Sequence, residues 1–204
     1  KDIEEAVKYF KMSYERKNFS GYAFYGDALI AGMGGIEKDE EEGLRLIKIS
    51  SDNNNMIGMN IYSYYLETGL QGLNKNEQLS FEYLKRAANL GLSSSMLKIG
   101  YYYETGDKVE TNINEAIKYY KKGIEQGSHK SAYYLGILLT QNDDQTLIDE
   151  GNKYIKYAAD NGYNHAISDY IENMIYYKTV DLNLDDLMKF LKLGIYMDDE
   201  WIII

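Results

Sequence analysis

The stretch that decides the fold is residues 94–130, SSMLKIGYYYETGDKVETNINEAIKYYKKGIEQGSHK. In its first half Ser95, Ile99 and Tyr103 are spaced four residues apart, which places them on one face of a helix. Gly106 follows, and glycine is a common left-handed end of a helix. The second half again has apolar and small residues at helical spacing and again ends in glycine. The stretch therefore predicts one repeat of helix, loop, helix and turn.

The same pattern recurs along the whole chain at intervals of 35 to 37 residues. A column of small residues contains Ser13, Ser50, Ala87, Gly123, Ala158 and Gly194. Four residues earlier lies an aromatic or leucine column, and four residues later lies a turn column of Lys17, Asn54, Gly91, Gly127, Gly162 and Asp198. Three columns in one register indicate a stacked repeat array, in which each repeat buries its apolar face against its neighbours.

The register predicts where the helices and the repeats lie. The expected helices are 2–17, then the pairs 20–31/39–53, 56–68/76–90, 93–105/112–126, 129–140/147–161 and 164–177/183–197. The expected repeats are 20–56, 57–93, 94–129, 130–164 and 165–200, after a second helix of a preceding repeat at 2–19 and before the start of a further helix at 201–204. We expect residues 1–204 to form a single solenoid and to be a portion of a longer protein.

Small residues recur inside the first helix of each repeat. Gly26, Ser63, Gly100 and Gly136 occupy the same position. A glycine inside a helix costs about 1 kcal/mol relative to alanine. We expect close approach of two helices to offset this cost.

The repeats resemble the Sel1-like repeat, a relative of the tetratricopeptide repeat. Residues 95–116 carry its pattern as Ser95, Ile99, Gly100, Tyr103, Gly106, Val109 and Ala116. The loop is best developed in Gly32-Met-Gly-Gly-Ile-Glu-Lys-Asp39, and the end of the repeat in Ala87-Ala88-Asn-Leu-Gly91 and Ala158-Ala159-Asp-Asn-Gly162. The resemblance covers essentially the whole chain: it is specific in the second to fourth repeats, fair in the first and degenerate in the fifth. It implies an all-α, right-handed superhelical solenoid of about five helix-turn-helix repeats.

Composition excludes several classes of function. The net charge is −10, which disfavours nucleic acid and anionic membrane surfaces as partners. The sequence has no run long and apolar enough to span a bilayer and no cysteine for disulfides or thiolate chemistry. We expect a soluble protein; the compartment stays open, with the cytoplasm slightly favoured.

The sequence offers no constellation for catalysis, a metal or a cofactor. His129 and His165, the only two histidines, lie one repeat apart at turns, where neighbouring repeats are offset. The glycines at 32–35 follow a helix, whereas a phosphate-binding loop follows a strand. We therefore expect no enzymatic activity, no metal and no cofactor.

The resemblance implies a protein-interaction scaffold or adaptor, in which the first helix of each repeat lines a concave face. By register, the residues predicted to bind a partner there are Asn60, Tyr64, Glu67, Leu97, Tyr101, Glu104, Tyr133 and Ile137. Tyrosine combines a large apolar area with a polar tip and often anchors interfaces. The same tyrosines could instead fill the space between neighbouring first helices. If they face a partner, the carboxylates favour a protein or peptide with basic residues.

Two other functions stay open. The chain could be a targeting or regulatory segment of a larger enzyme, which a catalytic domain elsewhere in the gene would reveal. It could also be a receptor for small molecules or glycans, with tyrosines stacking on sugar rings.

Overall fold

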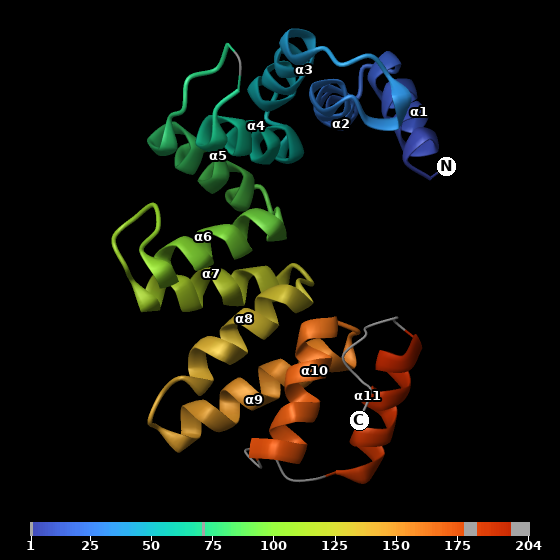
Figure 1. Cartoon of the computed structure of the whole chain (residues 1–204). Coiled ribbons are helices and arrows are strands. Elements are labelled where there is room, and N and C mark those ends of the chain that lie inside the picture. The colour runs from blue at the N-terminus through green and yellow to red at the C-terminus, as the bar shows by residue number, and fades with distance from the viewer. Residues whose placement is uncertain (1, 71, 178–182, 197–204) are drawn as a thin grey trace. The chain divides into compact units, whose positions relative to one another are not determined.

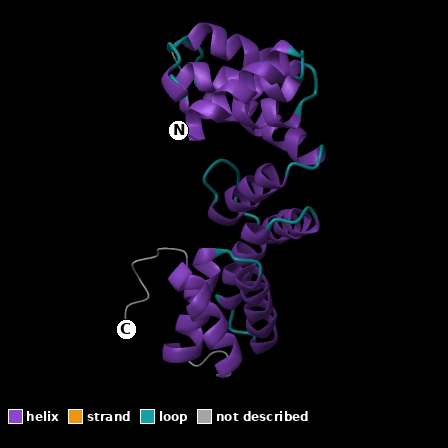
Figure 2. Ribbon diagram, turned by 90° about the vertical axis from the view of Figure 1, so that its right-hand side faces the viewer, coloured by secondary structure: helices purple, strands orange, loops and turns teal. Residues whose placement is uncertain are grey.

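The computed structural model describes residues 2–70, 72–177 and 183–196. Within these ranges the chain consists of helices joined by loops, without strands, and an isolated bridge joins Leu70 to Leu73 (Figures 1 and 2). The predicted all-α fold class is confirmed. The helix expected at 201–204, which includes Trp201, lies outside the described residues.

The helices match the predicted pairs closely. Their bounds are α1 Asp2–Glu15, α2 Phe19–Ala31, α3 Glu40–Asp52, α4 Met56–Thr68, α5 Glu77–Asn89, α6 Ser93–Thr105, α7 Ile113–Glu125, α8 His129–Thr140, α9 Gln145–Asp160, α10 Asn164–Glu172 and α11 Leu184–Tyr196. A short 3-10 helix, η1 (Met33–Gly35), follows α2, and a π-helical segment, η2 (Asn173–Tyr177), follows α10. The helix expected over 164–177 therefore changes its hydrogen-bonding pattern after Glu172.

The chain divides into two compact units, residues 1–116 and 117–204, and each is described by itself. The first unit contains α1 to α6, and the second contains α8 to α11. In both units a first helix packs against the second helix of its repeat, as α2 does on α3 and α8 on α9 (Figure 1). The single continuous solenoid over the whole chain stays a prediction.

Side chains in the loops define where the helices begin. Asn18, Asn55 and Asn76 accept hydrogen bonds from backbone N–H groups in the first turn of α2, α4 and α5. Asp39 does the same for α3, and Asn112, directly before α7, accepts from the Glu115 N–H. These caps satisfy donors that have no partner inside the helix.

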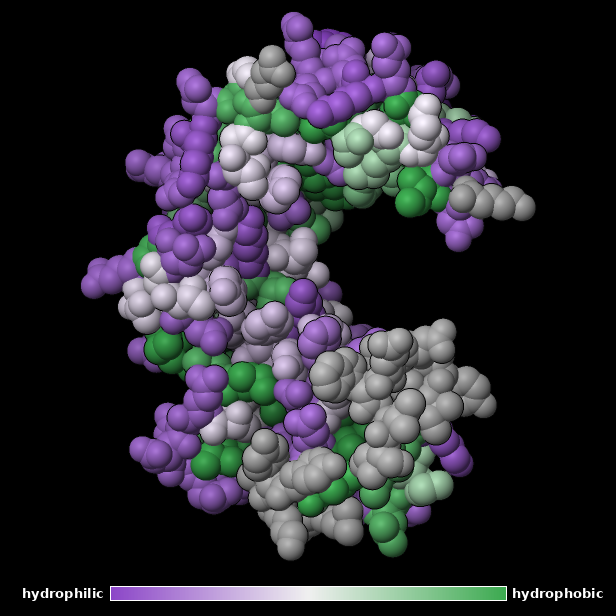
Figure 3. Space-filling model, in the orientation of Figure 1, coloured by the Kyte–Doolittle hydropathy of each residue, from purple (hydrophilic) through white to green (hydrophobic). Residues whose placement is uncertain are grey.

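The acidic run after Asp39 forms the first turn of α3. Glu40, Glu41 and Glu42 lie at the positive end of the helix dipole, and Glu42 also pairs with Arg45 at 2.6 Å. The surface over α3 is accordingly hydrophilic, as seen at the top of Figure 3.

The predicted turn column is left-handed at every described position. The φ angle is 100° at Gly91, 80° at Gly127 and 79° at Gly162. It is also positive at Lys17 (59°) and Asn54 (57°), which are the two described residues other than glycine in this region of the Ramachandran map. A side chain with a β-carbon is strained there, although asparagine tolerates it better than lysine does. The turn between repeats therefore requires this conformation whatever the residue.

Replacing Lys17 with glycine is expected to raise the free energy of unfolding by about 0.5 kcal/mol, because it relieves left-handed strain. Asn54→Gly should give a smaller gain. Urea unfolding of both variants checks this. A lower midpoint for Lys17→Gly than for the parent protein would contradict the argument.

Small residues allow the two helices of a repeat to touch through their backbones. A β-carbon added to Gly26 would lie 2.6 Å from the carbonyl oxygen of Gly43. In the second unit, one added to Gly136 would lie 2.8 Å from the carbonyl oxygen of Gly151. The predicted close approach is therefore present at both positions.

The small-residue column lies where a second helix meets the first helix of the next repeat. A β-carbon added to Gly21 would lie 2.6 Å from the Ser13 hydroxyl oxygen, and one added to Gly58 would lie 2.6 Å from the Ser50 β-carbon. Ser50 is fully buried, and its hydroxyl donates to the Phe19 carbonyl at 2.7 Å. The column is therefore a packing feature that sets the spacing of successive repeats.

Candidate protein-interaction surface

Two tyrosines on neighbouring first helices of the first unit are turned to solvent. Tyr64 on α4 is 52% exposed and Tyr101 on α6 is 44% exposed. Each lies beside a tyrosine that is buried: the Tyr64 and Tyr65 rings are 5.2 Å apart, and the Tyr101 and Tyr102 rings 6.5 Å apart. Each tyrosine pair therefore places one ring inside the protein and one on its surface.

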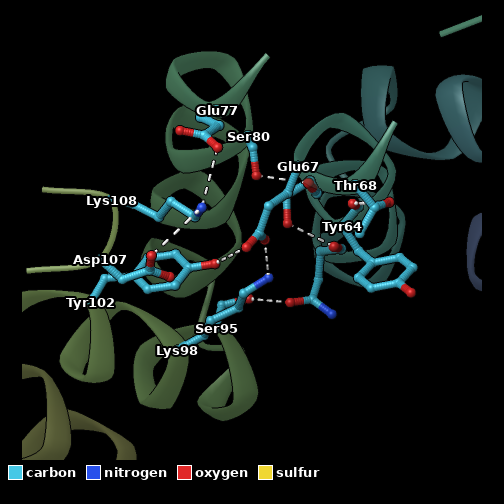
Figure 4. Close-up of polar contacts among 12 residues, drawn as sticks. Tyr64, Glu67, Thr68, Glu77, Ser80, Ser95, Lys98, Tyr102, Asp107 and Lys108 are labelled. Carbon is cyan, nitrogen blue, oxygen red and sulfur yellow. Dashed lines mark hydrogen bonds and ion pairs between the residues drawn. The ribbon is translucent and has the colours of Figure 1, made fainter. Parts of the chain in front are cut away.

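Glu67 on α4 links this helix to α6. One oxygen of its carboxylate accepts from Lys98 Nζ at 2.5 Å, and the other accepts from the Tyr102 hydroxyl at 2.7 Å. Asn60 Oδ1 accepts from the Ser95 hydroxyl at 2.9 Å, which adds a second link between the two helices. Figure 4 shows Lys98 and Tyr102 converging on the Glu67 carboxylate, with the Tyr64 ring pointing away from it. Glu67, predicted to bind a partner, thus already has partners inside the chain.

These contacts change the ionisation of the groups that make them. Burial alone would raise the pKa of Glu67, but the hydrogen bonds from Lys98 and Tyr102 outweigh it and lower this pKa. Burial, followed by the hydrogen bond to Glu67, raises the pKa of Tyr102. Glu67 is therefore anionic and Tyr102 neutral at physiological pH.

A similar contact joins α2 to α4. The Tyr65 hydroxyl donates to Asp27 Oδ1 at 2.7 Å. Burial and then this hydrogen bond raise the pKa of Tyr65. Tyr65 and Tyr102 occupy the same repeat position, so the first unit uses one buried tyrosine at each of these contacts between first helices.

In the second unit Tyr133 links two first helices. Its hydroxyl donates to Asp169 Oδ2 on α10 at 2.7 Å, and its ring lies 5.2 Å from that of Tyr163. Burial and the hydrogen bond to Asp169 raise the pKa of Tyr133. His165 stacks on Tyr163 at 5.4 Å. This placement of Tyr133 agrees better with the alternative in which the tyrosine fills the space between neighbouring first helices than with a contact to a partner.

The other predicted residues are less exposed than the two surface tyrosines. Leu97 and Glu104 are half-buried on α6, and Ile137 is half-buried on α8, where it lines a cavity. In the first unit, Tyr64 and Tyr101 with Asn60, Leu97 and Glu104 form what we call the α4–α6 surface. Whether a partner binds there stays a prediction.

Sequence reasoning did not identify Lys98, Tyr102 and Tyr65 as part of these contacts. The sequence did contain a signal for the two tyrosines, namely the tyrosine pair at 64–65 and the tyrosine run at 101–103. Adjacent residues point to different sides of a helix, so one tyrosine of each group had to face away from the surface. Among the described residues, no group of three or more His, Asp or Glu side chains is arranged to hold a metal ion.

The repeats match a known family. The Sel1 repeat matches residues 1–18, 20–55, 57–92 and 93–128. The chain belongs to the Sel1 repeat family. The matched residues stop before the fourth predicted repeat, so they lie mainly in the first unit of this Sel1 repeat protein.

Solved structures support the same fold over nearly the whole chain. A Sel1 repeat protein from Oxalobacter formigenes is 22% identical, with a TM-score of 0.78, and the match covers 96% of this chain and 80% of that one. A protective antigen of uropathogenic Escherichia coli with an SLR fold is 20% identical, with a TM-score of 0.69, and the match covers 96% of this chain but 42% of that one. An immunity protein from Pseudomonas aeruginosa is 17% identical, with a TM-score of 0.68, and the match covers 94% of this chain and 73% of that one. No curated protein matches the chain.

The chain is thus an all-α protein of the Sel1 repeat family. Sel1 repeat proteins generally act as non-catalytic scaffolds for protein interactions. None of the described helices is long and apolar enough to cross a membrane.

Proposed function

We propose that this Sel1 repeat protein is a protein-interaction scaffold that holds a protein or peptide on the α4–α6 surface. The observation that carries the proposal is the exposure of Tyr64 and Tyr101 at the same position of successive first helices. Exposed aromatic rings at repeat spacing give a partner two anchors of large area.

The links beneath the surface support the proposal by limiting the motion of both anchors. Glu67 joins α4 to α6 through Lys98 and Tyr102, and Asn60 joins them through Ser95. A surface that is already ordered loses less conformational entropy on binding. The half-buried Glu104 on the same helix as Tyr101 and the net charge of −10 favour a partner that carries lysine or arginine beside apolar side chains.

The test is affinity capture from a lysate of the source organism, followed by binding kinetics with each captured partner. Tyr101→Ala and Tyr64→Ala should each raise the dissociation rate by about tenfold, because aromatic anchors set the lifetime of a complex.

Tyr157→Ala is the matched control, since Tyr157 is 41% exposed but lies on α9, a second helix. It should leave the dissociation rate unchanged. A partner whose kinetics respond to neither Tyr64 nor Tyr101 would show that the α4–α6 surface is not the binding site.

A further inference from the structure

The second unit contains a cavity of about 440 Å³ beside two first helices, α8 and α10. Ile137, Ile148 and Ile155 provide its apolar wall. Asp169 and Glu172, one turn apart on α10, provide its carboxylates. No lysine or arginine lines this cavity.

The repeat register explains why space is left here. Asn173 occupies the position that Tyr65 and Tyr102 hold in the first unit. Those tyrosines are 8% and 4% exposed and reach a carboxylate on the preceding first helix. The side chain of asparagine is shorter by a whole ring, so the equivalent space beside Asn173 is not filled.

The first unit also shows which groups lie at the equivalent place. Lys98 lies at the position equivalent to Asp169, and its ammonium reaches Glu67 at 2.5 Å and lies 5.5 Å from the centre of the Tyr102 ring. In the second unit the corresponding lysine is replaced by a carboxylate, and Thr140 replaces Glu67. The two places are thus equivalent in the repeat, but the second has acidic groups without the cation.

We propose that this cavity receives a lysine or arginine side chain of a protein partner. The aliphatic stem would lie along Ile137 and Ile148, and the cationic head would reach Asp169 and Glu172. Asp169 uses Oδ2 to accept from Tyr133, which orients its carboxylate. Hydrogen bonds between a cation and a carboxylate are stronger than neutral ones, which gives the cavity its selectivity. The inference rests on the proposed scaffold function and adds the partner's chemistry at a second position.

The experiment uses the full chain at low ionic strength and two probes, Nα-acetyl-lysine methylamide and Nα-acetyl-norleucine methylamide. The second has a similar apolar stem but lacks the ammonium group. Backbone amide resonances of Ile137 and Thr140 are followed by NMR during titration. We expect saturable shifts with the lysine compound and none with the norleucine compound. Equal shifts with both probes, or none with lysine at these residues, would overturn the inference.

Two variants distinguish binding in the cavity from a general attraction of the cationic probe to an acidic protein. Glu172→Gln, at an exposed position, should weaken binding of the lysine probe by about tenfold, which corresponds to the loss of one charge-assisted hydrogen bond. Asp149→Asn, on the exposed side of α9, removes the same charge outside the cavity and should leave the affinity unchanged. Equal affinities for the Glu172→Gln variant and the parent protein would also overturn the inference.

The two proposals fail in distinguishable ways. A captured partner that depends on Tyr64 and Tyr101 would uphold the scaffold function even if the lysine probe did not bind. Binding of the lysine probe, together with a captured partner whose kinetics respond to neither Tyr64 nor Tyr101, would uphold the cavity and leave the α4–α6 surface without its role.

Discussion

Replacing Gly136 with leucine is expected to lower the free energy of unfolding by about 3 kcal/mol, because a large side chain is forced into a packed crossing. Even a β-carbon at this position would lie 2.6 Å from the Ile155 side chain and 2.8 Å from the Gly151 carbonyl oxygen. The backbone oxygen cannot move aside as a flexible side chain can, so α8 and α9 have to separate. Urea unfolding monitored by circular dichroism measures the loss.

Gly136→Ala makes the test more specific. At an unhindered position inside a helix, this change raises stability by about 1 kcal/mol through helix propensity. Here we expect Gly136→Ala to lower the free energy of unfolding. The sign of the change therefore shows whether α8 and α9 are in close contact at this position. Lys153→Leu, at an exposed position on α9, controls for the added apolar surface and should change little. A stabilised Gly136→Ala variant would show that α8 and α9 do not touch at this point.

Replacing Tyr102 with alanine is expected to lower the free energy of unfolding by about 3 kcal/mol, in the range for large aromatic side chains in a core. Tyr102 is 4% exposed, and its ring lies 6.3 Å from that of Phe81. The change also removes one hydrogen bond from Glu67, which leaves that half-buried carboxylate with Lys98 alone among the contacts described above.

Two variants separate the ring from the hydroxyl. Tyr102→Phe keeps the ring and loses the hydrogen bond, so it should cost about 1 kcal/mol. Tyr101→Ala removes the neighbouring, 44% exposed ring and should change stability by no more than about 0.5 kcal/mol. Similar losses for Tyr101→Ala and Tyr102→Ala would mean that the two rings are not divided between surface and interior.

Most of the fold could be predicted from the sequence because the residues that mark the helix ends lie close to those ends in the sequence. Glycine or asparagine at a repeated turn position and a capping side chain a few residues later fix the ends of most helices to within one or two residues. The beginning of α9 at Gln145, two residues earlier than expected, follows from the Asp144 cap, which the register did not reveal. The π-helical segment after Glu172 had no signal in the repeat pattern.

The candidate surface was less predictable because it depends on contacts between repeats. The register placed Tyr64 and Glu67 on the same side of α4. It could not show that Lys98 and Tyr102, more than 30 residues away, would reach Glu67, since this depends on the offset of α6 relative to α4. The register likewise gave no exposed fraction for Tyr64, which is 52% exposed.

In the first two repeats, the crossing between the two helices has different chemical forms. In the glycine form, Gly26 and Gly43 leave no room for a β-carbon on either side. In the serine form, Ser63 and Ser80 are both buried, and the Ser80 hydroxyl donates to the Ser63 carbonyl at 2.7 Å. Within each of these two repeats the facing residues are alike, so a substitution on one helix changes the space that its counterpart on the other helix occupies. We therefore expect helices exchanged between these two repeats to fit best when both helices are moved together, because a serine side chain opposite Gly26 or Gly43 has no room.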